Sequence, residues 1–232
     1  PLHVRLASRD GTYLLERDGI TINLAPTQLR PLIKYRMKTG FLDYESEESR
    51  AISTHLNPDI DVIELGAGVG FISCLIDRKL SDSAVHIAVE ANPELIPTLK
   101  QNRERNHARF EVRHAAYSPT DETVALNIYD DYRSSGIYNK AGKKGNEVAV
   151  EGVKLASLVE EFNISRFTLV GDIEGVEANL ILEEWEILEK HCDTLVLEFH
   201  DRNPDTPKAK SKLSNSAFER VSRYSDVEVW KR

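Results

Sequence analysis

Short apolar runs alternate with longer amphipathic segments over most of this chain. Strand-like runs occupy residues 62–65, 85–89, 110–116, 167–170 and 194–199. Two of them, at 167–170 and 194–197, are almost unbroken in apolar side chains, as expected for strands that are covered on both faces. Segments with helical spacing separate the runs, and this repeated strand–helix alternation predicts an α/β fold. We expect an open, doubly wound, mostly parallel sheet with helices on both faces.

The segments between and around these runs complete the outline. The predicted helices cover residues 45–56, 71–80, 93–106, 155–162, 178–191 and 217–224, and a last strand covers 227–230. Near the start, the β-prone runs 13–15 and 20–22 flank Asp18-Gly19. Both of these residues tolerate the positive φ of a type I′ turn, so a β-hairpin is predicted there. A further helix is predicted over residues 27–37.

A polar, glycine-containing stretch over residues 118–152 interrupts the strand–helix rhythm. Strand-like runs at 124–129 and 148–150 lie within it. Two interpretations remain open, a solvated hairpin and a flap beside the substrate at the ends of the strands. The predicted organisation is therefore an N-terminal hairpin and helical cap over residues 1–57, followed by a core over residues 58–232 that carries the insertion.

Composition and charge narrow the classes of function. The 232 residues carry a formal net charge of −8, which disfavours a protein that wraps a nucleic-acid backbone, because such binding neutralises phosphates. No apolar run is long enough to cross a membrane, and the first residues do not open a signal peptide, so we expect a cytoplasmic protein. Cys74 and Cys192 stand in apolar surroundings, which favours buried free thiols over a disulfide.

The strongest chemical motif is a glycine-rich turn between the first predicted core strand and its helix. Gly66, Gly68 and Gly70 let the chain bend sharply and expose bare backbone, and the helix start offers unpaired N–H groups to a ligand. A dinucleotide-binding turn needs a third glycine or an alanine at the position that Phe71 occupies. Glu64, just before the turn, would repel a pyrophosphate but suits an ammonium group, so an amino-acid-bearing cofactor is favoured.

A second candidate lies at the end of the next strand. Glu90 follows that strand about 20 residues after the glycine turn, where a carboxylate can accept hydrogen bonds from ribose hydroxyls. Ala115 and Ala116 come after the third strand. With Tyr117 they would flank the adenine of a nucleoside bound at this edge.

Two further segments, 171–177 and 197–200, carry acidic residues where later strands are expected to end. With 64–70 and 89–93, they make the chain resemble class I S-adenosylmethionine-dependent methyltransferases and, more narrowly, the FkbM family. The Asp-x-Glu-Gly-x-Glu pattern that begins at Asp172 is the most family-specific element. The resemblance implies a Rossmann-like sheet, bound S-adenosylmethionine, and methyl transfer to a hydroxyl oxygen of a small-molecule or carbohydrate-like substrate.

The motifs and the resemblance together give a candidate site. Asp172 and His200 follow neighbouring strands, and either is a candidate general base, with histidine better matched to neutral pH. Glu174 is a third candidate catalytic residue, although Glu174 and Glu177 also suit the free amides of a helix start. The candidate cofactor-binding residues are Glu64, Gly66, Ala67, Gly68, Gly70, Phe71, Glu90, Ala91, Asn92, Ala115, Ala116 and, by resemblance alone, Tyr44.

A metal-assisted site is the alternative at the same strand ends. Carboxylate and imidazole ligands for Mg²⁺ or Mn²⁺ are offered by Asp172, Glu174, His200 and Asp201. No tight ligand spacing demands a metal, so the sequence favours a site without one.

Two features depart from the family pattern. A lysine often precedes the aspartate in the family as Lys-x-Asp, whereas Val170-Gly171 precede Asp172 here. The sequence after the predicted strand 227–230 is also too short for the final antiparallel strand that is usual in this fold. We therefore expect either a truncated chain or an unusual sheet edge.

Other classes of function stay open at this point. An NAD(P)-dependent oxidoreductase is opposed by Phe71 in the third glycine position. A cofactor-binding module without catalysis would keep the glycine turn but would not need Asp172 or His200. A nucleic-acid methyltransferase is opposed by the acidic balance and the lack of interleaved aromatic and basic residues. We expect a small-molecule or glycan substrate and no nucleic-acid or membrane partner.

Overall fold

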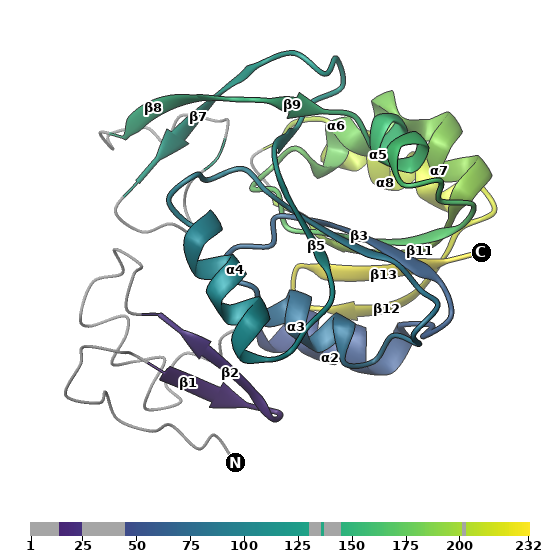
Figure 1. Ribbon diagram of the computed structural model, residues 1–232. Helices are drawn as coiled ribbons and strands as arrows, with labels where there is room; N and C mark the ends of the chain where they lie inside the picture. Colours follow the sequence, from purple (N-terminus) through teal and green to yellow (C-terminus); the bar gives the residue numbers. More distant parts are fainter. Residues whose placement is uncertain (1–13, 25–44, 130–135, 137–144, 201–202) are drawn as a thin grey trace.

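A seven-stranded sheet forms the centre of the molecule in the computed structural model, which describes residues 14–24, 45–129, 136, 145–200 and 203–232 (Figure 1). The strand order is β12-β13-β11-β10-β3-β4-β5. The strands are β3 (Asp61–Leu65), β4 (His86–Glu90), β5 (Glu111–His114), β10 (Phe167–Gly171), β11 (Cys192–Glu198), β12 (Glu219–Tyr224) and β13 (Val227–Lys231). Strands β11, β10, β3, β4 and β5 are parallel neighbours, whereas β13 is antiparallel to both β11 and β12.

Helices cover both faces of this sheet (Figure 1). One face carries α2 (Ser46–His55), α3 (Phe71–Asp77) and α4 (Ile96–Arg105), and the other carries α5 (Leu155–Glu161), α6 (Glu177–Glu183), α7 (Trp185–His191) and α8 (Thr206–Ser214). Successive residues of β3 point to opposite faces, so Val62 lies in the hydrophobic cluster of the first face and Ile63 in that of the second. The doubly wound, mostly parallel α/β fold predicted from the sequence is confirmed.

Two predicted helices differ from the structure. The segment predicted as a helix at 178–191 is two helices, α6 and α7, separated at Glu184. Glu184 is buried, and its carboxylate accepts the N–H groups of Leu155 and Ala156 at 2.6 and 2.9 Å. It thereby satisfies free amides at the start of α5, a distant contact that helical periodicity does not reveal.

The predicted helix at 217–224 is wrong, because this segment forms the edge strand β12. The helix of this region is α8, which the sequence analysis missed and which starts with a proline in its first turn. Because β12 supplies the sixth strand, β13 serves as the antiparallel strand that lies between β11 and β12. The expectation that too little sequence remained for that strand is therefore also wrong.

The N-terminal hairpin matches its prediction. Strands β1 (Leu14–Arg17) and β2 (Ile20–Asn23) pair antiparallel, and Asp18 and Gly19 have φ of 52° and 74°, as a type I′ turn requires. The backbone N–H of Asn23 donates to Oδ1 of Asn102 on α4 at 2.7 Å. The hairpin thus shares the core of α3 and α4. The predicted helix 27–37 lies outside the described residues, and the division at residue 57 stays a prediction.

The 118–152 insertion contains the predicted strand pair. Strands β7 (Val124–Ile128) and β8 (Asn146–Val150) are antiparallel, and Gly136 forms a bridge with Asn127. At its base, β6 (Ala116–Tyr117) pairs with β9 (Gly152–Val153). A side chain at Gly152 would overlap the carbonyl oxygen of Glu122, so only glycine allows this close backbone approach.

The structure also bears on the two cysteines and on the question of a membrane span. Cys74 and Cys192 are both buried and free, as expected. None of the helices in the described ranges combines the length and the apolar character that crossing a membrane requires.

Candidate functional site

A cavity of about 370 Å³ opens at the carboxyl ends of β3, β4, β10 and β11. This is the edge where ligands bind in open α/β sheets, and the volume lies within the usual range for ligand sites. It is lined by Glu45, Glu47, Glu48, Glu64, Leu65, Gly66, Ala67, Gly68, Phe71, Ile72, Val89, Glu90, Ala91, Asn92, Leu95, Ala115, Ala116, Tyr117, Leu126, Gly136, Val170, Asp172, Ile173, Glu174, Val176, Glu198 and His200.

The glycine turn, together with Glu64 and Glu90, forms one part of the cavity lining, which we call the cofactor half. The N–H groups of Gly66 and Ala67 donate to the carbonyl oxygen of Val89 at 2.9 and 3.0 Å, which ties the turn to β4. Gly66 has a φ of +94°, and a side chain there would overlap the carbonyl oxygen of Asp172. Only glycine meets both conditions, so the turn follows directly from the motif.

Glu90 is the acidic anchor of the cofactor half. Its Oε2 accepts the N–H of Gly68 and its Oε1 accepts the N–H of Asn92, both at 2.7 Å. Burial raises the pKa of Glu90 to about 7, although these hydrogen bonds favour the ionised form, and the charge of Glu64 raises the pKa further. Each carboxylate oxygen has a second lone pair. Glu90 can therefore hold the turn and still accept hydrogen bonds from ligand hydroxyls.

Glu64 already has a protein partner. Its Oε2 lies 3.0 Å from Nε2 of His86, and both side chains are almost fully buried. Glu64 also lines the cavity. The ring of His86 therefore orients the carboxylate, and contact with a ligand ammonium stays a prediction.

The structure brings most of the predicted cofactor-binding residues to this cavity. Those that line it are Glu64, Gly66, Ala67, Gly68, Phe71, Glu90, Ala91, Asn92, Ala115 and Ala116. Gly70 is not among the described lining residues. It precedes α3 with a φ of +88°, and a side chain there would collide with Leu99, so its requirement for glycine is structural. Tyr44 lies outside the described residues.

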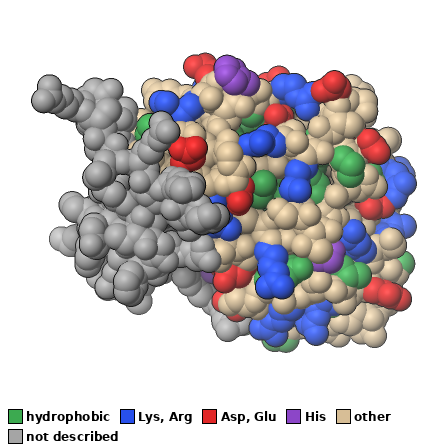
Figure 2. Space-filling model, turned by 90° about the horizontal axis from the view of Figure 1, so that it is seen from below, with side chains coloured by type: hydrophobic (Ala, Val, Ile, Leu, Met, Phe, Trp, Pro, Cys, Tyr) green, Lys and Arg blue, Asp and Glu red, His purple; other side chains and the backbone are tan. Residues whose placement is uncertain are grey.

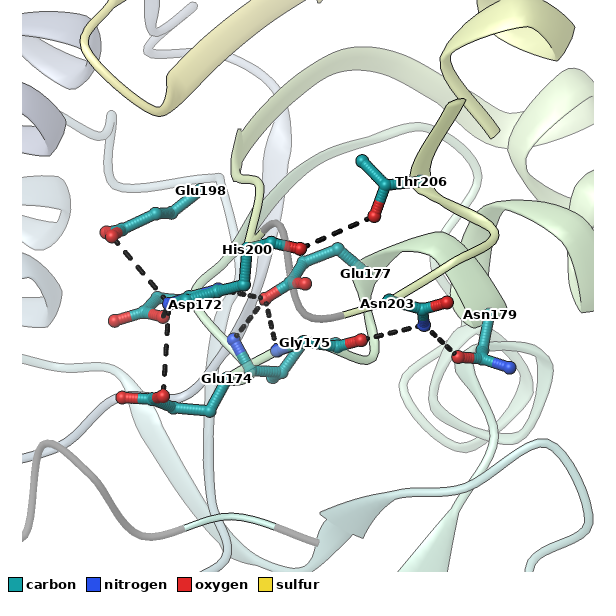
Figure 3. Close-up of polar contacts among 10 residues, drawn as sticks. Asp172, Glu174, Gly175, Glu177, Asn179, Glu198, His200, Asn203 and Thr206 are labelled. Atoms are coloured by element: carbon teal, nitrogen blue, oxygen red, sulfur yellow. Dashed lines mark hydrogen bonds and ion pairs between the residues drawn. The ribbon is translucent and has the colours of Figure 1, made fainter. Parts of the chain in front are cut away.

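Residues from two other chain segments form a second group, which we call the acceptor half. Asp172, Glu174, Glu198 and His200 line the cavity, and Glu177 contacts His200. Glu177 begins α6 and is fully buried. Its Oε1 accepts the N–H groups of Ile173 and Gly175 at 3.2 and 3.1 Å, and it also lies 3.0 Å from Nδ1 of His200 (Figure 3). Glu177 thus fixes both the loop after β10 and the orientation of the imidazole ring.

The other ring nitrogen of His200 faces three carboxylates (Figure 3). Its Nε2 lies 3.7 Å from Oδ1 of Asp172, 3.8 Å from Oε1 of Glu198 and 3.9 Å from Oε2 of Glu174. The Oδ1 of Asp172 is shielded from solvent and accepts no hydrogen bond from the described residues. The acceptor half therefore concentrates negative charge around one imidazole nitrogen.

The carboxylates around His200 change the pKa of the residues in the acceptor half. Burial alone would lower the pKa of His200, but the hydrogen bond and charge of Glu177, with the charges of Asp172 and Glu174, raise it to about 9. Burial, and then the charge of Glu198, raise the pKa of Asp172 well above its usual value. His200 therefore holds a proton at neutral pH, whereas the sequence analysis expected an imidazole that titrates there.

Sequence reasoning missed two acidic contributors. Glu198 stands two residues before His200, a strand spacing that places both side chains on one side. Glu48 lies on α2, one helical turn after Glu45, and both line the cavity. Asp201, the remaining metal candidate, lies outside the described residues.

The cavity differs in charge from the face of the molecule that Figure 2 shows. Basic and acidic side chains are interspersed on the face that Figure 2 shows. Along the cavity, by contrast, the described lining residues include carboxylates of both halves and no Lys or Arg. A ligand of this cavity is therefore expected to bring positive charge.

Comparison with known proteins gives a family match. The model of the methyltransferase FkbM domain matches residues 64–224. No curated protein sequence matches the chain.

Three solved structures are among those to which this chain is similar. A protein of the NADB-Rossmann superfamily from Streptococcus agalactiae has a TM-score of 0.49 and 16% identity, covering 82% of this chain and 69% of that one. A putative tRNA (m1A22) methyltransferase of Streptococcus pneumoniae has a TM-score of 0.49 and 14% identity, covering 80% and 69%. The precorrin-6y C5,15-methyltransferase of Geobacter metallireducens has a TM-score of 0.46 and 16% identity, covering 80% and 86%. Nothing about the substrate of this chain follows from such distant likenesses.

Proposed function

The chain belongs to the FkbM methyltransferase family, and from that premise we propose that it is an S-adenosylmethionine-dependent O-methyltransferase. Its acceptor is a hydroxyl group of a small-molecule or carbohydrate-like substrate. The observation that carries this proposal is that the Gly66 turn and Glu90 line the same cavity as Asp172 and His200. A methyl donor and a hydroxyl acceptor can share such a cavity away from bulk water.

The cofactor half fits the chemistry of S-adenosylmethionine. The bare backbone at Gly66 and Gly68 allows close approach, and Glu90 offers acceptor lone pairs to ribose hydroxyls. Ala115 and Ala116 are small and buried, which leaves room for a flat base beside them. Glu64 and the other carboxylates of the cavity favour a ligand that carries ammonium and sulfonium charges.

The bound cofactor supplies an electrophilic methyl group: the acceptor oxygen forms a bond to its carbon while the carbon–sulfur bond breaks and leaves its electron pair on sulfur. The chain must align the two partners, which is worth about 7–11 kcal/mol. It must also remove the hydroxyl proton. We propose that Asp172 accepts this proton as the general base, because its raised pKa makes its carboxylate a stronger base than that of an ordinary aspartate. His200, held by Glu177, keeps the carboxylates in place.

A methyl-transfer assay tests this proposal. The full chain would be incubated with radiolabelled S-adenosylmethionine and a panel of hydroxylated metabolites and glycans, with transfer RNA included as a nucleic-acid acceptor. We expect label in a hydroxyl-bearing metabolite or glycan and loss of this activity in Asp172→Asn. Glu111→Gln is the control, since Glu111 is exposed on β5.

Other outcomes would replace the proposal. Label in transfer RNA alone would replace the acceptor class. Binding of NADH without binding of S-adenosylhomocysteine would favour an oxidoreductase. Cofactor binding with no transfer to any acceptor, and full biological function in Asp172→Ala and His200→Ala, would favour a module without catalysis.

A further inference from the structure

We propose that the methyl acceptor carries a primary ammonium group beside its reacting hydroxyl, as amino alcohols and amino sugars do, and that Glu48 and Glu45 of α2 bind this ammonium group. The inference rests on the proposed function, because it names the chemical class of the acceptor. It also goes beyond the proposed function, since a neutral sugar would satisfy that function equally well.

Glu48 is the side chain that points most directly to a bound cation. It is only 5% exposed, and it lines the cavity. No N–H group or hydroxyl of the described residues donates a hydrogen bond to its carboxyl group, and its side-chain partner is another carboxyl group, that of Glu45. A buried carboxylate without a donor is costly. The donor must therefore come from a ligand in the cavity.

The surroundings of Glu48 are strongly anionic. The charges of Glu45, Asp172 and Glu198 act on Glu48, and all of these residues line the same cavity. The carboxylate of Glu198 extends toward His200, at 3.8 Å from its Nε2 (Figure 3). His200 is the only basic side chain among the described lining residues. A positively charged group of the ligand therefore suits this part of the cavity.

The backbone supports a binding role for the start of α2. Glu45 and Glu174 have φ of 50° and 52°, a left-handed conformation that residues with a long side chain rarely adopt. Both residues line the cavity. Such strained conformations cluster at ligand-binding sites, where they hold a side chain in place. At Glu45 the conformation begins α2 one helical turn before Glu48, so that the two carboxyl groups meet.

The cofactor leaves these carboxylates available. Neighbouring strands lie about 4.8 Å apart, so the end of β11, which carries Glu198, is about 14 Å from the end of β4, which carries Glu90. The ammonium group of the cofactor already has a proposed partner in Glu64 on β3. The cofactor carboxylate also offsets one of its two positive charges. The carboxylates beside α2 therefore remain for the acceptor.

The spacing of these carboxylates suits an ammonium group better than a metal ion. An ammonium nitrogen lies about 2.8 Å from each oxygen that it binds, whereas Mg²⁺ lies about 2.1 Å from its ligands. In the part of the chain that the structure describes, the group with metal-ligand spacing is Asp172, Glu177 and His200. Glu45 and Glu48 do not belong to it. An ammonium group has three N–H donors, enough to bind both carboxyl groups.

Binding the acceptor as an ammonium ion also directs the methyl group to oxygen. Nearby carboxylates favour the charged form of an amine, and an ammonium nitrogen has no lone pair with which to attack the methyl carbon. The neighbouring hydroxyl gives its proton to Asp172 as its oxygen bonds to the methyl carbon, and the carbon–sulfur pair stays on sulfur. Glu48 and Glu45 thus hold the acceptor, while Asp172 takes part in the reaction.

Pairs of small molecules that differ only in charge test this inference. The full chain, saturated with S-adenosylhomocysteine, would be titrated with glucosamine and glucose, and with ethanolamine and ethylene glycol, and followed by ligand-observed nuclear magnetic resonance. We expect at least one amine to bind at least about tenfold more tightly than its neutral partner, the scale of a hydrogen bond to a charged group. This preference should be lost in Glu48→Gln and kept in Glu111→Gln, which changes an exposed residue of β5.

A second measurement separates the acceptor from the cofactor. The Kd of Glu48→Gln for S-adenosylhomocysteine should stay within about threefold of that of the unsubstituted chain. If it rises as much as the Kd for the amine, Glu48 binds the cofactor and the inference is overturned. Thermal melting shows whether each variant is folded. Glu45→Gln, which changes a less buried residue, gives the same test if Glu48→Gln does not fold.

The remaining outcomes distinguish this inference from the proposed function. If S-adenosylhomocysteine binds and neither amine binds more tightly than its neutral partner, the inference is overturned and the proposed function stands. If an amine is preferred equally in Glu48→Gln and in Glu45→Gln, the inference is overturned as well. If the folded chain does not bind S-adenosylhomocysteine, the proposed function falls, and the inference falls with it.

Discussion

The two halves of the cavity are built in different ways. In the cofactor half, backbone N–H groups of the glycine turn and of Asn92 are hydrogen-bonded to Glu90 and to Val89. In the acceptor half, side chains from β10, α6 and β11 bring like charges around His200. The first arrangement is satisfied by the protein itself. The second gathers several carboxylates around one protonated imidazole, so it favours a positively charged ligand.

The two halves nevertheless share one contact. The backbone of Gly66 lies directly against the carbonyl of Asp172, and the N–H of Asp172 donates to the carbonyl oxygen of Leu65 at 3.1 Å. The glycine turn and the first acceptor carboxylate are therefore held at a fixed separation. A substitution at Gly66 should disturb the structure of both halves. A substitution of the Asp172 or Glu90 carboxyl group should disturb the function of one half.

The largest effect is expected from Gly66→Ala. The new side chain would meet the carbonyl of Asp172 and would need a φ of +94°, so we expect a loss of about 3 kcal/mol or more in the free energy of unfolding. Urea denaturation measures it. Gly171→Ala is the control, because its side chain would meet only the end of Leu197. Equal losses in the two variants would contradict the proposed contact.

The next effect separates chemistry from cofactor binding. Asp172→Asn removes the proposed base, and we expect methyl transfer to fall by about 10²–10⁴-fold. Its amide keeps the size of the side chain, so the Kd for S-adenosylhomocysteine should stay within about threefold. The assay with radiolabelled donor and calorimetry measure the two quantities. A parallel loss of both would mean that Asp172 belongs to the cofactor half.

A smaller effect is expected from Glu90→Gln. Glu90 accepts hydrogen bonds from two backbone N–H groups, and in the variant one of them would face the amide NH₂ of glutamine. That hydrogen bond would be lost, and a hydrogen bond to a charged group is worth about 1.5–3 kcal/mol. We expect affinity for S-adenosylhomocysteine to fall by about 10- to 100-fold. Calorimetry measures it, with Glu111→Gln as the control. Unchanged affinity would remove Glu90 from the binding site.

The smallest effect is a dependence of binding on pH. The pKa of Glu90 is about 7 because of burial, with Glu64 adding to the shift, and ribose hydroxyls prefer the ionised carboxylate. Affinity for S-adenosylhomocysteine should therefore fall by up to about tenfold per pH unit below pH 7. His86, the partner of Glu64, also faces this region, so His86→Asn must be compared. The dependence should disappear in Glu90→Gln and persist in His86→Asn.

The raised pKa of Glu90 has opposite effects on folding and on cofactor binding as the pH falls. A buried carboxyl with a raised pKa favours the folded state at low pH and loses that contribution as pH rises from about 4.5 to 7. Weaker binding at pH 6 would therefore not result from Glu90 destabilising the fold.

The same difference between the halves decides what the sequence could predict. The glycine turn and Glu90 belong to short local motifs, so their positions at the strand ends followed from the chain itself. Gly70 is the exception, since it meets Leu99 rather than the cavity. In the acceptor half, Asp172 and His200 were predicted from strand ends. Their surroundings were not, because these depend on how α2 and β11 approach in space.

The C-terminal segment shows the same limit for the fold. Residues of β12 are mostly exposed because the strand is at the edge of the sheet, so its apolar pattern is weak. Its identity as a strand comes from pairing with β13. Local sequence favoured a helix there, and tertiary pairing overrode it.

Calorimetric titration with S-adenosylhomocysteine tests the central claim most directly. The account predicts one site per chain, with a Kd below about 100 µM, that is weakened in Glu90→Gln and preserved in Asp172→Asn. Absence of binding to the folded chain, or binding that Glu90→Gln leaves unchanged, would contradict it.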